Sequence, residues 1–66
     1  MFKPEDVKRV RERLGKSQAA FASMIGVSVG TLRNWEQGRR VPEGPARALL
    51  TVASKHPEAV VDALGT

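Results

Sequence analysis

Apolar residues recur at helical spacing in five separate segments of the chain. The first stripe consists of Val7, Val10 and Leu14, and Gly15 follows it. Pro4 stands ahead of the stripe, where its fixed φ suits the first position of a helix. The pattern predicts five short helices at residues 4–14, 18–25, 29–37, 45–55 and 57–64. No alternating pattern typical of strands accompanies them.

The second and third predicted helices are separated only by a short turn. Ser17 and Ser28 stand directly before them, where a hydroxyl accepts a backbone N–H of the first helical turn. Gly26 interrupts the apolar pattern between the two. The inward positions are taken by apolar residues: Ala20, Phe21, Met24, Ile25, Leu32 and Trp35. Two capped helices joined by about three residues predict a helix-turn-helix.

The C-terminal third of the chain completes the predicted bundle. The fourth helix has an apolar stripe at i, i+3, i+4 and i+7: Ala46, Leu49, Leu50 and Ala53. In the last helix, Val60, Val61 and Leu64 share one side, and they either contribute to a contact between two copies or close the core of one chain. The sequence therefore predicts an all-α, five-helix bundle with a helix-turn-helix, in a single domain spanning residues 1–66.

Charge is concentrated in the middle of the chain. The formal net charge is +4, and the segment from Lys8 to Arg47 holds nine bases and three acids, an excess of +6. This excess coincides with the helix-turn-helix and favours a polyanionic partner. With no Cys and one His, we expect no metal site. No catalytic arrangement, cofactor motif, secretion segment or membrane span stands out, so we expect a cytoplasmic protein that is not an enzyme.

The third predicted helix presents polar groups opposite its apolar side. At 100° per residue, the outward face holds Val29, Gly30, Arg33, Asn34 and Gln37. An Arg forks onto guanine O6 and N7, an Asn onto adenine N6 and N7, and a Val methyl meets the thymine methyl. These five residues are the candidates for reading bases of double-stranded DNA, and the alternative is an ordinary solvated face.

A second set of candidates lies around this helix. Gln18 opens the second helix, where free backbone N–H groups and the helix dipole favour a phosphate. The predicted phosphate-binding residues are polar or basic: Gln18, Lys16, Ser28, Arg39 and Arg40. Such contacts supply affinity and salt dependence with little sequence preference. For the two loop arginines, the alternative is a solubilising charged loop.

The run SQAAFASMIGVSVGTLRNWEQG, within residues 7–50, resembles the Cro/repressor (XRE-like) DNA-binding family. The further run NWEQGRRVPEGPARALL, followed by KHPEAV, is similar to HigA-type antitoxins and related small regulators. This resemblance implies a homodimer on a palindromic operator, autorepression and a toxin protein as partner. It also implies that Glu36 pairs with Arg11 and that Gln18 supports the reading helix. Gly30 departs from the longer polar side chain common at its position.

Two alternatives share these residues. A small phage-type repressor without a toxin would have the same DNA-binding surface. The other alternative is a protein-interaction module with a vestigial DNA surface. The presence of Arg33, Asn34 and Gln18 argues against this alternative.

Overall fold

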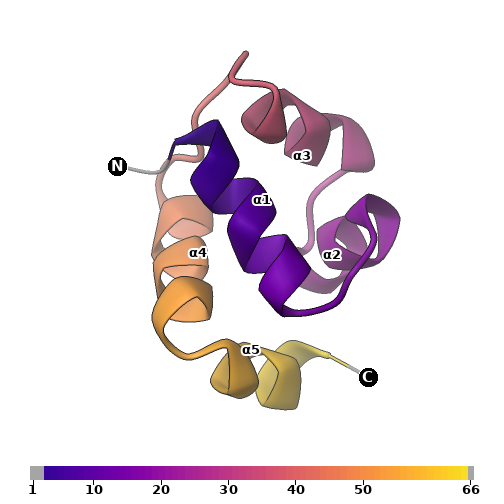
Figure 1. Cartoon of the computed structure of the whole chain (residues 1–66), viewed down its shortest axis with the longest axis vertical. Helices are drawn as coiled ribbons and strands as arrows, with labels where there is room; N and C mark the ends of the chain where they lie inside the picture. Colours follow the sequence, from indigo (N-terminus) through magenta and orange to yellow (C-terminus); the bar gives the residue numbers. More distant parts are fainter. Residues whose placement is uncertain (1–2, 66) are drawn as a thin grey trace.

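The computed structural model describes residues 3–65 of the chain. Within this range lie five α-helices and no strand: α1 (Pro4–Arg13), α2 (Gln18–Ile25), α3 (Val29–Glu36), α4 (Pro45–Lys55) and α5 (Pro57–Leu64). The helix α1 crosses the middle of the molecule and packs against α3 and α4, while α2 packs against α3 and α4 against α5 (Figure 1). The predicted all-α bundle with a helix-turn-helix is confirmed.

The two serines that precede α2 and α3 cap them. Ser17 Oγ accepts the backbone N–H of Ala20 at 3.1 Å, and Ser28 Oγ accepts that of Thr31 at 3.0 Å. Gly26 ends α2 with φ +79°, a left-handed conformation that glycine adopts without the penalty a side chain imposes. Ser17 fixes the start of α2, and Gly26 and Ser28 fix the short turn between the two helices, so the direction of α3 follows from local sequence.

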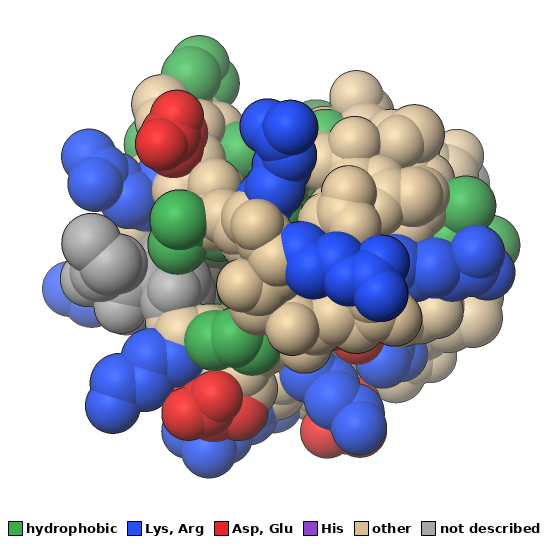
Figure 2. All heavy atoms as spheres, turned by 90° about the horizontal axis from the view of Figure 1, so that it is seen from above, with side chains coloured by type: hydrophobic (Ala, Val, Ile, Leu, Met, Phe, Trp, Pro, Cys, Tyr) green, Lys and Arg blue, Asp and Glu red, His purple; other side chains and the backbone are tan. Residues whose placement is uncertain are grey.

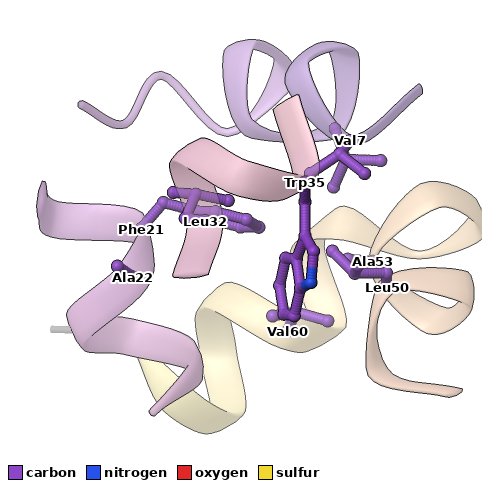
Figure 3. Close-up of a cluster of buried hydrophobic side chains, with 9 residues drawn as sticks. Val7, Phe21, Ala22, Leu32, Trp35, Leu50, Ala53 and Val60 are labelled. Carbon is purple, nitrogen blue, oxygen red and sulfur yellow. The ribbon is translucent and has the colours of Figure 1, made fainter. Parts of the chain in front are cut away.

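A small apolar core holds the helices together. Its buried members come from every helix: Val7, Val10, Phe21, Ala22, Leu32, Trp35, Leu50, Ala53 and Val60. Phe21 and Leu32 are fully buried, and the ring of Trp35 lies in the middle of the cluster (Figure 3). Both aromatic side chains of the helix-turn-helix therefore serve packing, which keeps α3 seated on α1 and α2.

Three details of the sequence prediction were wrong. The helix α1 ends at Arg13, one residue before its predicted end at Leu14. The helix α3 ends at Glu36, so Gln37, predicted as its last residue, is its C-cap. In α2, Ala20 is exposed and Ala22 is buried. Both alanines lie about 100° from Phe21 around the helix axis, on opposite sides, so periodicity alone does not choose between them. The position of α3 decides which of the two alanines is buried.

The three apolar residues of the last helix, α5, differ in burial, although the sequence placed them on one side. Val60 is 3% exposed and belongs to the core, whereas Val61 and Leu64 are 37% and 45% exposed. Of the two roles expected for these residues, Val60 therefore takes the second and closes the core of one chain. Nearby, Arg13 Nη1 donates to the Ser54 carbonyl at 2.9 Å and links α1 to the last turn of α4. Between residues 3 and 65, no helix is long and apolar enough to cross a membrane.

Candidate nucleic-acid interface

The predicted base-reading residues share the outer face of α3 but differ in exposure. Gly30, Arg33 and Gln37 are exposed, whereas Val29 and Asn34 are half-buried. Val29 packs against the edge of the core, so part of its side chain already serves the fold. The most accessible groups on this face are therefore the Arg33 guanidinium and the Gln37 amide.

The loop after α3 is folded back onto the end of that helix. The carbonyl of Asn34 accepts the backbone N–H groups of Arg39 and Arg40 at 2.9 and 3.3 Å. Gly38 makes this turn with φ +79°, and a Cβ there would lie 3.1 Å from Pro4 Cγ, a tight approach to α1. The loop thus holds the backbone of both arginines beside the C-terminal end of α3, where cations are favoured by the helix dipole.

An ion pair connects α1 with α3 underneath this surface. Arg11 Nε donates to Glu36 Oε2 at 2.7 Å, and Arg11 Nη2 donates to Glu36 Oε1 at 3.1 Å. The remaining guanidinium nitrogen, Nη1, donates to the Lys16 carbonyl at 3.0 Å. The side chains of Arg11 and Glu36 are 13% and 6% exposed. One guanidinium therefore links α1, the loop before α2, and α3.

The charged forms of both partners are stabilised. Burial by itself raises the pKa of Glu36, but hydrogen bonds from Arg11 and Gln18 and the charge of Arg11 outweigh it, so the pKa lies below the usual value. The hydrogen bond with Glu36 raises the pKa of Arg11 despite partial burial. Both groups are therefore ionised at neutral pH.

Gln18 extends the ion pair to the outer face of α3. Its Nε2 donates to Glu36 Oε1 at 3.2 Å, while its Oε1 accepts from Arg33 Nε at 3.4 Å. The amide nitrogen carries a second hydrogen that remains for another acceptor. The orientation of the Gln18 amide is set by the carboxylate on one side and the guanidinium on the other. Sequence reasoning found Gln18 but not its contact with Arg33, since the residues are fifteen positions apart.

The other phosphate candidates lie at helix starts and in loops. Ser28 Oγ is engaged as the cap of α3, and it also donates to Thr31 Oγ1 at 2.9 Å. Lys16 is half-buried in the loop before α2, and its side chain borders a groove between α2 and α5. Arg39 and Arg40 are exposed. Figure 2 shows the end of the molecule that carries the loop after α3. Lys and Arg side chains cross the middle of this face, and Asp and Glu side chains lie towards its margins.

Comparison with known proteins places this geometry in context. The family described as Helix-turn-helix matches residues 7–45, which include α2, α3 and the loop that follows. The chain is also 44% identical, over 55 residues, to Antitoxin HigA-2 of Vibrio cholerae serotype O1 (strain ATCC 39315 / El Tor Inaba N16961). The matched part covers 83% of this chain and 53% of that protein, so the chain spans about half of its relative's length. The chain belongs to the Cro/repressor (XRE-like) family of helix-turn-helix DNA-binding proteins.

Proposed function

We propose that this protein is a sequence-specific regulator of transcription that represses its own gene, in the manner of a HigA-type antitoxin. The observation that supports this most strongly is the chain of hydrogen bonds from Glu36 through Gln18 to Arg33. An exposed arginine that is bonded to the ion pair through Gln18 is suited to a fixed contact rather than to general solvation. The similarity to Antitoxin HigA-2 supports the same class of regulator.

In the proposed complex, α3 lies in the major groove of double-stranded DNA. Arg33 donates two hydrogen bonds to a guanine, and Asn34 pairs with an adenine through its amide. Gln37 and Val29 complete the contacts to base edges near the two ends of α3. Gln18 has a second amide hydrogen that a phosphate oxygen accepts, so one residue both supports Arg33 and binds the DNA backbone.

The basic and polar residues predicted to bind phosphates supply affinity without sequence preference. Arg39 and Arg40 approach one phosphate strand from the loop, and Lys16 and Ser28 lie near the starts of α2 and α3. Each arginine that neutralises a phosphate releases condensed counterions, so binding weakens as salt rises. The structured backbone of the loop brings the charges of Arg39 and Arg40 to the C-terminal end of α3.

A homodimer on a palindromic operator completes the proposal. Two reading helices one DNA turn apart recognise the two halves of such a site. Val61 and Leu64 are the exposed apolar residues of α5 and form the proposed contact between copies. A toxin protein is a further proposed partner, supported only by the name of the relative. A phage-type repressor without a toxin is the second candidate, because it would use the same surface.

The test is footprinting on the DNA directly upstream of the gene, followed by binding measurements with five variants. We expect Arg33→Ala and Asn34→Ala each to lose about 1–3 kcal/mol on the protected site and to relax preference at particular base pairs. Arg39→Ala and Arg40→Ala are expected to weaken cognate and random duplexes alike. Gln18→Ala removes a phosphate contact and the support of Arg33 together, so it should weaken both duplexes and the cognate one more. For each loop arginine, the slope of log affinity against log salt should flatten by about one.

Glu58→Gln serves as the control, because Glu58 is an exposed carboxylate in the first turn of α5. It should leave both affinity and base preference unchanged. If Arg33→Ala weakens both duplexes equally and keeps the base preference, α3 is not the reading helix. If the wild type binds neither duplex at low salt, the interaction-module alternative replaces this proposal.

A further inference from the structure

Gly30 is a helical glycine that the fold itself does not require. It lies in the first turn of α3, outside the left-handed conformation adopted by Gly26 and Gly38. A Cβ built at Gly30 would meet only Ser28 Oγ, at 3.8 Å, which is an ordinary van der Waals contact. Neither the backbone nor internal packing excludes alanine, although alanine favours a helix more than glycine does. The described fold therefore supplies no reason for glycine at this position, and a functional reason would lie outside the chain.

The position of Gly30 indicates what approaches it. Around the helix axis, Gly30 lies about 20° from Gln37, about 40° from Asn34 and about 60° from Arg33. It is therefore at the centre of the outer face, with polar side chains on both sides. If α3 occupies the major groove, as in the proposed function on which this step rests, the centre of its face meets base edges, while its flanks meet the phosphates.

The part of Gly30 that faces outward from the helix is its Cα, because the free backbone N–H of this first turn points along the helix axis. The residue has no side-chain donor or acceptor. Among the groups on the floor of the major groove, the apolar one is the 5-methyl of thymine. Val29, the preceding residue, contributes a further apolar side chain that is partly held by the core. We propose that Gly30 determines specificity: the gap left by its missing side chain receives the 5-methyl group of one thymine in the operator.

The test pairs a methyl added to the protein with a methyl removed from the DNA. Duplexes are first enriched from a random library with the wild type, and each conserved thymine is then replaced singly by deoxyuridine. For the wild type, we expect one replacement to weaken binding about fourfold, the value of one buried methyl group. Gly30→Ala should weaken binding to the thymine duplex at least tenfold, and the same deoxyuridine should restore most of that loss.

Two controls separate a clash with the thymine methyl from a loss of folded protein. Thermal unfolding of Gly30→Ala should show an equal or higher midpoint, so its weaker binding does not arise from misfolding. Ser23→Ala is the matched control, because Ser23 is an exposed small residue in α2, away from the outer face of α3, and it should bind both duplexes as the wild type does.

Three outcomes would overturn the inference. The first is that Gly30→Ala binds both the thymine and the deoxyuridine duplexes as tightly as the wild type does, which would leave Gly30 without a role. The second is an equal loss on every duplex, which would mean that the gap meets the DNA backbone rather than a methyl group. The third is failure of the wild type to enrich any sequence. In that case the proposed function fails as well, whereas the first two outcomes leave it standing.

Discussion

Replacing Glu36 by glutamine tests whether the ion pair between α1 and α3 holds the interface in place. The change keeps the size of the side chain and removes its charge, which leaves the Arg11 guanidinium, 13% exposed, without its paired carboxylate. Breaking a buried pair by removing one partner costs about 3–5 kcal/mol. Here Arg11 keeps its bond to the Lys16 carbonyl, and the new amide oxygen accepts a further bond. We therefore expect a loss of about 2–3 kcal/mol.

Such a loss is large for a chain of 66 residues. Domains of this size unfold with roughly 3–10 kcal/mol in total, and the midpoint of thermal unfolding should fall by roughly 8–24 °C. Urea and thermal unfolding followed by circular dichroism measure it directly. DNA binding should weaken at the same time, because Gln18 loses the carboxylate that orients its amide. Glu43→Gln, an exposed carboxylate in the loop after α3, is the control and should change stability by less than about 0.5 kcal/mol.

The dependence on pH gives a second, independent check. Because the pKa of Glu36 is lowered in the folded state, its contribution is present above the usual carboxyl pKa and is lost as pH falls through the lowered value. The difference in stability between wild type and Glu36→Gln should be full at pH 7 and should close below about pH 4. A difference under about 0.5 kcal/mol at pH 7, or one that stays constant down to pH 3, would refute the reasoning.

The remaining predictions concern the cap, the core and the last helix. Ser17→Ala should cost about 1 kcal/mol in urea unfolding, because the first turn of α2 loses its side-chain acceptor; an unchanged midpoint would exclude the cap. Leu32→Ala, at a fully buried site, should cost about 2–5 kcal/mol and lower the thermal midpoint, and a loss below about 1 kcal/mol would contradict the packing. If the proposed dimer forms, Val61→Asp should shift it to monomer in sedimentation without changing the circular dichroism spectrum, and a wild type that stays monomeric on operator DNA would remove the proposed contact.

Much of the fold was predictable because its signals are local. The Ser17 and Ser28 caps, Gly26 and the prolines at the starts of α4 and α5 each mark a boundary within a few residues of sequence. Where local signals are symmetric, prediction failed: Ala20 and Ala22 are chemically identical and equally distant from Phe21 around the helix. The separation of Val60 from Val61 likewise depends on how α5 meets α4.

The sequence predicted which candidate residues share a helix face or a loop, but not which hydrogen bonds connect them. Helical periodicity places Arg33 and Asn34 on one face, and composition marks the loop arginines as basic. The hydrogen bonds that join Gln18 to Arg33 and Arg11 to the Lys16 carbonyl depend on the distance between elements. No pattern along the chain encodes such distances, so the hydrogen bonds that support the candidate reading face are visible only in the packed structure.

The tie between the Asn34 carbonyl and the loop that follows it has a consequence for the entropy of binding. Because the backbone N–H groups of Arg39 and Arg40 are already bonded to α3, the order of this segment is established when the chain folds, before any encounter with DNA. In the proposed complex with DNA, each arginine then loses only side-chain freedom, about 0.5–1.5 kcal/mol. Inserting one residue after Gly38 would return the backbone to many conformations, and affinity would fall although every charge remained in the protein.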